Sequence, residues 1–164
     1  MVDAVFFDLF GTLLSLAPLD DACEGVAPGR GAELAARWRA RQLEASWLRT
    51  AMDRWVDFDT VTREALHATL DELGIAAEGD RDAETLADAF AELPLVAGAA
   101  DGVRHLHDAN LVTGILTNAS TRTLARVADR LDAEPAFQRG RLRRHNSDIS
   151  VRRVIGKGTP LRAS

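Results

Sequence analysis

The sequence predicts an α/β protein in which a parallel sheet is interrupted by a long helical insertion. Two short apolar runs indicate buried strands, at residues 4–7 (AVFF) and 111–118 (LVTGILTN). Such runs need no polar alternation, because both faces of a parallel strand are covered. The stretches between and after the two runs repeat apolar residues at helical spacing. Strands that alternate with helices are typical of a parallel sheet.

The first strand, residues 4–7, leads into a turn that carries a candidate chemical group. Asp8 ends the apolar run, and Gly11 and Thr12 follow it closely. Ligands of open parallel sheets bind at the carboxyl ends of the strands. A carboxylate placed there can act as a nucleophile, a metal ligand or a general base. The alternative is an aspartate that only caps the next turn.

Four segments with helical character make up the insertion. In order they are residues 17–31, which mix loop and short helix, then 32–54, 60–73 and 81–92. Thr60 is a candidate N-cap, since its side-chain oxygen can accept from a backbone amide of the first turn. Gly74 is the expected stop signal of that helix, and Pro94 ends the last segment.

The part after the insertion predicts a helix, a strand and a second helix. The first helix is expected over residues 101–109, just before the strand at 111–118. Ser120 follows that strand and is the expected N-cap of a helix over residues 121–131.

The composition excludes several classes of protein. The chain has 164 residues, of which 46% are hydrophobic, so wholesale disorder is excluded. Cys23 is the single cysteine, which excludes an internal disulfide framework and suggests an inert thiol. His105 and His107 lie two apart on an expected helix, so they diverge and do not indicate a zinc site.

The N-terminal run also bears on location. It carries acids at positions 3 and 8, which is wrong for a signal peptide. No apolar run in the chain approaches 18 residues, so no membrane span is expected. We therefore expect a soluble, cytoplasmic protein that has no membrane partner.

Charge divides the chain into two unlike parts. Residues 1–137 carry 12 arginines, no lysine and 24 acids, whereas residues 138–164 carry seven arginines, Lys157 and the single acid Asp148. The formal net charges are therefore −12 and +7, within a total of −5. A change of sign this abrupt indicates that the two parts of the chain differ in origin or in role.

The residues around the two predicted strands match a known pattern. D-L-F-G-T-L, residues 8–13, resembles the first motif of the haloacid dehalogenase superfamily, in which the aspartate is a covalent nucleophile. L-T-N, residues 116–118, resembles the second motif, with Thr117 in the Ser/Thr position. The two motifs occur in the family's order, with helical segments between them. Taken alone, Thr117 and Asn118 can also be a simple strand-end turn.

The helical insertion narrows the resemblance to one subfamily. R-W-R-A-R-Q-L-E-A-S-W-L-R, residues 37–49, resembles the cap helix of type II L-2-haloacid dehalogenases. The segments at 28–31 (PGRG) and 57–66 (DFDTVTREAL) are similar to the same subfamily. The resemblance covers roughly residues 4–134. It implies a Rossmann-like parallel sheet core, incomplete here, with an inserted α-helical cap.

The resemblance also implies a division of the chain. Residues 1–14 and 95–137 would form the partial sheet core, and residues 15–94 would form the cap. Residues 138–164 match no family element and are expected to be a disordered basic tail.

The implied activity is hydrolytic dehalogenation of short L-2-haloalkanoic acids, the work of a hydrolase that acts on carbon–halide bonds. Asp8 would displace the halide from the α-carbon and form an aspartyl ester, which water cleaves to a 2-hydroxy acid of inverted configuration. Arg39 would hold the departing halide, helped by Asn118, because a guanidinium is always charged and offers several donors. The simpler reading of Arg39 is a solvated helix charge. The resemblance implies no cofactor.

The remaining implied site residues bind the nucleophile or the substrate. Thr12 and Thr117 would hydrogen-bond the attacking carboxylate or the substrate carboxylate. Phe10, Leu43 and Trp47 would line the apolar side of the pocket. A tryptophan on a helix is more often a core residue, which is the simpler reading of Trp47.

An independent chemical argument comes from Phe10. Phosphatases of the superfamily usually carry a second aspartate two residues after the nucleophile, because their alkoxide leaving group must be protonated. A halide needs no proton, so a chain with Asp8 and Phe10 has kept the nucleophile and lost the acid. This pattern favours dehalogenation and argues against phosphoryl transfer and Mg²⁺. A superfamily phosphatase remains the alternative enzyme.

The resemblance ends after Phe137. A third core strand and a Lys-Pro pair are expected there, but Lys157 is followed by glycine. A frameshift or an early stop in the coding sequence explains this arginine-rich end. The rival explanation is a genuine tail that binds nucleic acid, which the charge of −12 in the body and the lack of aromatic residues in the tail oppose. We therefore expect no nucleic-acid partner.

A chain truncated in this way lacks the groups that position water for ester hydrolysis. We expect steady turnover to be impaired or absent, and an inactive fragment or interaction module is the non-enzyme alternative. The expected partners are a 2-haloacid substrate and the released halide. A homodimer through the cap is also expected, since the family often dimerises through cap helices.

Overall fold

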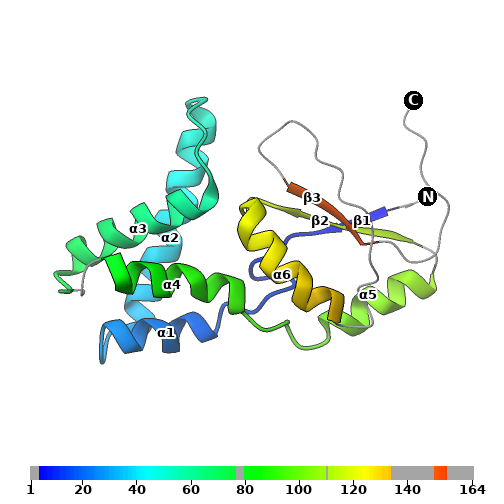
Figure 1. Ribbon diagram of the computed structural model, residues 1–164, viewed down its shortest axis with the longest axis horizontal. Helices are drawn as coiled ribbons and strands as arrows, with labels where there is room; N and C mark the ends of the chain where they lie inside the picture. The colour runs from blue at the N-terminus through cyan, green and yellow to red at the C-terminus, as the bar shows by residue number, and fades with distance from the viewer. Residues whose placement is uncertain (1–3, 77–79, 110, 134–149, 155–164) are drawn as a thin grey trace. The chain divides into compact units, whose positions relative to one another are not determined.

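The chain, described by a computed structural model, forms two units that we call the sheet unit and the helical unit. The sheet unit comprises Met1–Ser15, Pro94–Asn118 and Ala125–Ser164, and the helical unit comprises Leu16–Leu93 and Ala119–Leu124 (Figure 1). The structure describes residues 4–76, 80–109, 111–133 and 150–154.

The strands of the sheet unit form one sheet. In the spatial order β1-β2-β3 they are β1 (Ala4–Phe7), β2 (Val112–Thr117) and β3 (Ser150–Val154). β1 and β2 are parallel, with Phe7 opposite Ile115, so the predicted parallel pair is confirmed. The expected burial of both faces is wrong for β1, where Phe6 is 57% exposed. Among the described strands, β1 lies at the edge of this sheet, with β2 as its neighbour.

β3 lies in the segment for which the sequence predicts a disordered tail. Ser150–Val154 pair antiparallel with β2, and Thr117 is opposite Ser150. The expectation of disorder is therefore wrong for this strand, and the rest of residues 138–164 lies outside the described residues. The side of β2 that faces away from β1 presents a row of backbone groups, and β3 pairs with them.

α5 (Ala99–Asp108) precedes β2 and packs on it. Val103 of this helix is buried, and a hydrogen bond of 2.8 Å joins Nε2 of His107 to Oγ1 of Thr113 in β2. The helix begins at Ala99 rather than at residue 101, because Gly98 adopts a left-handed conformation (φ 81°) that turns the chain into the helix.

α6 (Thr121–Ala133) follows β2 and has its N-terminal residues in the helical unit. Ser120 caps it as predicted, since the Thr123 amide donates to the Ser120 hydroxyl oxygen at 3.1 Å. The Ser120 hydroxyl donates to Oδ2 of Asp59 at 2.5 Å, and the Thr123 hydroxyl donates to Oδ1 at 3.1 Å. The sequence-based division assigns residues 119–124 to the core, but these bonds tie the segment to the helical unit.

The described helices that make up the body of the helical unit match the four predicted segments. They are α1 (Pro18–Val26), α2 (Gly31–Ala51), α3 (Phe58–Leu73) and α4 (Asp80–Glu92). α2 packs against both α1 and α3 (Figure 1). Trp38 of α2 is buried, and its ring meets Phe90 of α4 edge-on, with the ring centroids 5.2 Å apart.

Both ends of α3 are capped. Asp57 is the N-cap: its Oδ1 accepts from the Thr60 amide at 2.9 Å and its Oδ2 from the Thr60 hydroxyl at 2.7 Å. The predicted cap at Thr60 is wrong, because the Asp57 carboxylate engages both donors of Thr60 and starts the helix at Phe58. Gly74 ends the helix as predicted, in the left-handed conformation (φ 62°).

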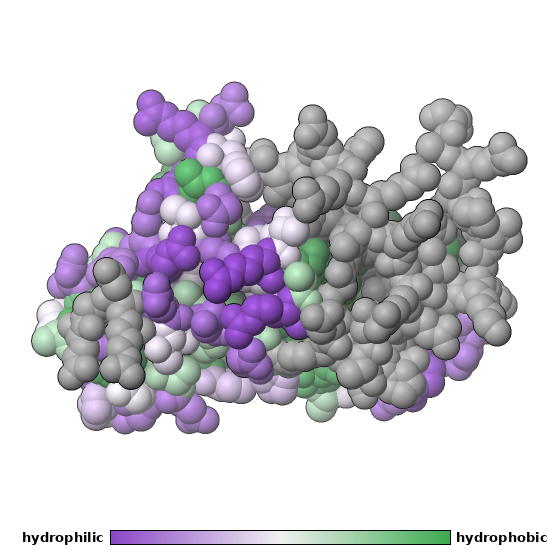
Figure 2. Space-filling model, viewed as in Figure 1, coloured by the Kyte–Doolittle hydropathy of each residue, from purple (hydrophilic) through white to green (hydrophobic). Residues whose placement is uncertain are grey.

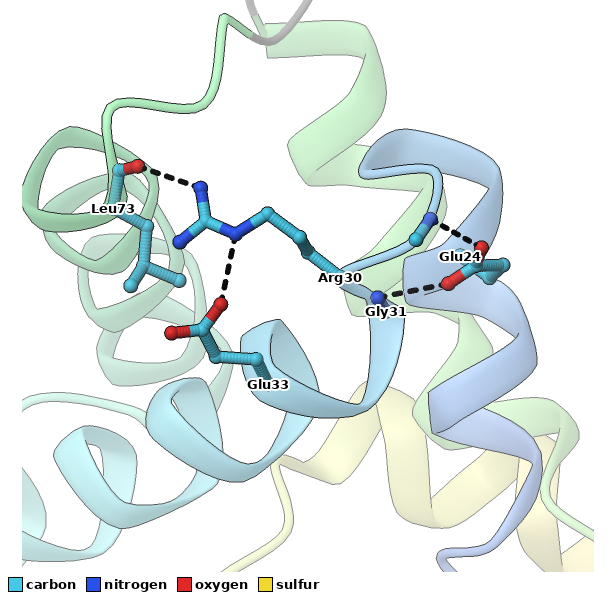
Figure 3. A network of polar contacts seen from close by, with 6 residues as sticks. Glu24, Arg30, Gly31, Glu33 and Leu73 are labelled. Carbon is cyan, nitrogen blue, oxygen red and sulfur yellow. Dashed lines mark hydrogen bonds and ion pairs between the residues drawn. The ribbon is translucent and has the colours of Figure 1, made fainter.

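A polar network fixes the loop between α1 and α2 (Figure 3). Glu24 of α1 accepts from the backbone amides of Gly29 and Gly31 at 2.5 Å and 2.9 Å. These two bonds hold the pKa of the Glu24 carboxyl below its ordinary value. Arg30 donates from Nη1 to the Leu73 carbonyl at the end of α3, 2.9 Å away. The loop therefore connects the ends of three helices.

Candidate active site

The loop after β1 separates buried from exposed side chains. Its buried anchors are Leu9, Phe10, Leu13 and Leu14. Asp8 and Thr12 are exposed. Gly11 adopts φ 87°, and its amide donates to the Leu14 carbonyl at 2.8 Å, which closes the turn. The loop therefore presents the Asp8 carboxylate to solvent on a backbone that apolar side chains hold in place.

The same loop is bonded to the segment that leads to α5. The Val96 amide donates to the Leu13 carbonyl at 2.9 Å, and the Ser15 amide donates to the Pro94 carbonyl at 2.8 Å. These backbone bonds brace the end of the loop against a second stretch of chain. A candidate nucleophile needs such a support, because reactive geometry tolerates little displacement.

β1 and β2 bring three predicted site residues to one edge of the sheet. The strands are parallel, so their carboxyl ends lie side by side, and Phe7 opposite Ile115 is the last pair. Asp8 follows β1 directly. Thr117 is the last residue of β2 and is buried at 3% exposure, whereas Asn118 is exposed. This edge is where ligands of open parallel sheets bind.

Three other predicted site residues share one face of α2. Arg39, Leu43 and Trp47 follow one another at intervals of four, which aligns them along one stripe of the helix. Arg39 and Leu43 are half-buried. The reading of Trp47 as a core residue is wrong, since its side chain is 66% exposed. These three residues belong to the helical unit, and Asp8 belongs to the sheet unit.

The sequence did not point to Gln42, which the structure places next to Arg39. Its Oε1 accepts from Nη1 of Arg39 at 2.5 Å, and its Nε2 donates to Oγ1 of Thr62 in α3 at 2.6 Å. Gln42 is fully buried at 0% exposure. The available signal was an amide on the apolar stripe of α2, four residues after Trp38 and eight after Leu34.

Three further features of the described residues concern metal binding, membrane spans and thiol chemistry. Among them, no three His, Cys, Asp or Glu side chains gather into a group able to hold a metal ion. No helix in the described ranges is long and apolar enough to cross a membrane. Cys23 is buried, and desolvation raises the pKa of its thiol to about 12, so the thiol stays protonated at neutral pH.

A family model described as haloacid dehalogenase-like hydrolase matches residues 2–157 of the chain. The chain belongs to the haloacid dehalogenase-like hydrolase family. The match continues past Phe137, so the expectation that the resemblance ends there is wrong at the level of the family.

Curated relatives of this haloacid dehalogenase-like hydrolase carry dehalogenase names. The (S)-2-haloacid dehalogenase of Pseudomonas putida is 38% identical over 136 residues, which are 83% of this chain and 60% of the relative. The protein of that name from Xanthobacter autotrophicus is 51% identical over 75 residues, which are 46% of this chain and 30% of the relative. The chain thus spans about 60% of the length of the Pseudomonas putida relative.

Several solved structures similar to this family member are dehalogenases. L-2-haloacid dehalogenase from Xanthobacter autotrophicus is 38% identical with a TM-score of 0.74, and the match covers 84% of this chain and 55% of that one. A structure of the same enzyme with chloropropionic acid covalently bound gives 37% identity and a TM-score of 0.74. The α/β fold of the chain therefore matches the fold of these enzymes.

Proposed function

We propose that this family member catalyses hydrolytic dehalogenation of short L-2-haloalkanoic acids. The observation that carries the proposal is an exposed carboxylate, Asp8, followed two residues later by Phe10, which is buried at 7% exposure. A phosphatase needs an acid at the second position to protonate its leaving group, whereas a halide leaves without a proton. The similarity to an enzyme that holds chloropropionic acid covalently supports a covalent route.

The reaction has two half-reactions. A carboxylate oxygen of Asp8 attacks the α-carbon, the new carbon–oxygen bond forms as the carbon–halogen bond breaks, and the halide leaves with the electron pair. Water then attacks the carbonyl carbon of the ester. The acyl–oxygen bond breaks, which restores Asp8 and releases a proton and a 2-hydroxy acid of inverted configuration.

The similarity to L-2-haloacid dehalogenases supports roles for the other site residues. Arg39 and Asn118 hold the departing halide, since their N–H groups are donors and the guanidinium is always charged. Thr12 and Thr117 hydrogen-bond the Asp8 carboxylate or the substrate carboxylate. The apolar side of the pocket is lined by Phe10, Leu43 and Trp47.

Halide release from L-2-chloropropionate tests the proposal. We expect at least one equivalent of chloride per chain, and one propionate unit added at Asp8 in the intact mass spectrum. The Asp8→Ala variant should lose both signals, because it has no attacking oxygen. Asp21→Ala, which removes another exposed carboxylate, should keep both.

Two results would contradict the proposal. One is a folded chain that yields neither chloride nor ester. The other is hydrolysis of p-nitrophenyl phosphate with Mg²⁺, lost on Asp8→Ala, which would favour the phosphatase. Continued chloride release beyond one equivalent would show that this chain also completes the second half-reaction.

We also propose that the helical unit is the cap of the enzyme and pairs with a second copy in a homodimer. The apolar side chains that support this are each more than half exposed near the end of α2: Trp47, Leu48, Met52 and Trp55. Hydrophilic residues gather across the middle of the face of the helical unit seen in Figure 2. Sedimentation velocity should show a dimer that Leu48→Glu converts to a monomer, and a wild-type monomer would contradict the pairing.

The proposed location is the cytoplasm. Cys23 is a free, buried thiol, which suits a reducing compartment. Cell fractionation tests this location, and recovery of the protein outside the cytoplasmic fraction would contradict it.

A further inference from the structure

A chain of hydrogen bonds leads from Arg39 on α2 to the backbone of α3. Nη1 of Arg39 donates to Oε1 of Gln42 at 2.5 Å, and Nε2 of Gln42 donates to Oγ1 of Thr62 at 2.6 Å. The Thr62 hydroxyl in turn donates to the Phe58 carbonyl at 2.6 Å. Arg39 is half-buried, whereas Gln42 and Thr62 are both buried. The chain therefore runs from the outer stripe of α2 into the core of the helical unit.

The direction of this chain is determined by its last member. A hydroxyl has one hydrogen, and Thr62 gives it to the Phe58 carbonyl, so its oxygen can only accept from Gln42. The amide of Gln42 must then turn its NH₂ group toward Thr62 and its oxygen toward Arg39. A carbonyl oxygen is the group that a guanidinium needs as a partner.

Thr62 is itself held by the neighbouring core. The indole Nε1 of Trp38 donates to the Thr62 carbonyl at 2.8 Å, which ties α2 to the same turn of α3. Thr62, which anchors this relay of hydrogen bonds from Arg39 through Gln42, is thus bonded through both its hydroxyl and its carbonyl.

Core packing alone does not call for glutamine at this position. Leu34, Trp38 and Gln42 are buried at intervals of four on α2. A buried amide costs free energy unless it is hydrogen-bonded, and an apolar side chain of similar shape is often as stable or more stable. The Gln42 amide is therefore better explained by its hydrogen bonds to Arg39 and Thr62 than by packing in the core.

We propose that Gln42 is a positioning residue, which fixes the Arg39 guanidinium in one orientation through Thr62. This proposal rests on the proposed function for one point only, that Arg39 receives the halide. An arginine held in this way offers N–H groups to the departing halide at a fixed place, without first losing the entropy of a loose side chain.

Three variants separate positioning from folding. Gln42→Leu removes the partner of Arg39, and Thr62→Val removes the anchor of Gln42 while keeping the side-chain shape. Thr62→Ser keeps the hydroxyl and should rescue the relay. Thr69→Val is the matched control, because Thr69 is also buried on α3 and its hydroxyl also donates to a carbonyl one turn back, at 2.7 Å.

The first measurement needs no turnover. In ¹⁵N NMR of the wild-type chain, the Arg39 guanidinium protons, assigned through Arg39→Lys, should exchange slowly with water. Their exchange should stay slow in Thr62→Ser and Thr69→Val, and it should become fast in Gln42→Leu and Thr62→Val. Fast exchange in the wild type, or slow exchange in Gln42→Leu, would overturn the proposal. Thermal melting should show Gln42→Leu folded.

The second measurement is the first-turnover rate of halide release from 2-chloropropionate and from 2-bromopropionate. Chloride is the poorer leaving group and depends more on stabilisation by Arg39. Gln42→Leu and Thr62→Val should therefore slow chloride release about tenfold more than bromide release, as expected for misplacement of a reacting partner. Loss of folded protein lowers both rates equally, as Thr69→Val should show.

Failure of the proposed function and failure of the positioning proposal give different results. A wild-type chain that releases neither halide refutes the proposed function, while the exchange of the Arg39 protons still decides the positioning. A wild-type chain that releases halide, with equal bromide-to-chloride ratios in Gln42→Leu and Thr69→Val, refutes the positioning alone.

Discussion

Gly31 lies where the start of α2 comes close to the backbone of α1. A Cβ atom added there would lie 2.5 Å from the Glu24 backbone nitrogen and 2.6 Å from the Asp20 carbonyl oxygen. Both neighbours are backbone atoms of a helix, so neither can move aside easily. The glycine in the PGRG loop therefore serves close packing, which no local sequence rule distinguishes from a turn.

Gly31→Ala should destabilise the chain by about 1–3 kcal/mol, the usual cost of forcing extra atoms into a packed place. Gly25→Ala is the matched control in α1, where an added Cβ meets nothing within 4 Å. It should stabilise the chain by about 0.5–1 kcal/mol, because glycine is unfavourable inside a helix. Urea unfolding of both variants checks this, and equal midpoints would show that the junction relaxes.

Glu24 gives the same junction a dependence on pH. Amides of Gly29 and then Gly31 hold its pKa below the ordinary value in the folded chain. A lowered folded pKa contributes stability that is present above the ordinary pKa, about 4.3, and is lost as the pH falls through the folded value. Glu24→Gln should therefore lower the urea midpoint at pH 7. The difference between the two proteins should shrink at pH 3, and a constant difference would contradict the assignment.

At the scale of elements, the start of α6 depends on residues from two parts of the chain. Ser120 caps the helix locally, and Asp59 of α3 accepts from both the Ser120 and the Thr123 hydroxyls. A carboxylate near a helix N-terminus is also favoured by the helix dipole. The segment that follows Asn118 is thereby bonded to the helical unit.

Ser120→Ala should destabilise the chain by about 1 kcal/mol, the typical cost of losing an N-cap. Thr121→Ala, which alters an exposed neighbour, should change stability by at most a few tenths of that. Thermal unfolding of the two variants measures the difference. Equal melting temperatures would mean that Asp59 alone suffices to start the helix.

Element types followed from periodicity, whereas several element ends did not. The apolar run at residues 4–7 coincides with β1, and Gly74 ends α3 as expected. Thr60 was expected as a cap, but Asp57 takes that place because its carboxylate accepts from two donors at once. Cap choice depends on which neighbouring group wins a local competition, and spacing does not reveal the winner.

At the scale of the whole molecule, β3 pairs with the side of β2 that faces away from β1, because the strand order is β1-β2-β3. The sheet already exposes two large apolar side chains, Phe6 and Leu116. An uncovered β2 would add a row of unpaired backbone groups to this surface. Such an edge is a template for aggregation.

A chain that ends at residue 149 should therefore aggregate faster than the full chain. A chain that ends at Val154, which keeps β3, is the matched control and should behave like the full chain. Light scattering during incubation at 37 °C compares the three. Equal scattering from the two shortened chains would show that β3 does not protect the sheet.

The candidate site was predictable where it follows from strand order. Asp8 directly follows β1 and Thr117 ends β2, so their place at one edge of the parallel pair follows from topology. The contacts of Gln42 with Thr62 and of Asp59 with Ser120 were not predictable, because they join residues 20 and 61 positions apart. The role of Asp8 is a prediction that Asp8→Ala tests, and the positioning of Arg39 is one that Gln42→Leu tests.

The α/β class, the parallel pair and the position of the candidate nucleophile follow from the sequence, because apolar periodicity is a local property and strands joined through helices pair in parallel. The partner of Arg39, the anchor of α6 and the place of β3 follow only from the fold. Each of these is a choice among distant hydrogen-bonding groups. Burial leaves such a group with few partners, and folding brings the right one near.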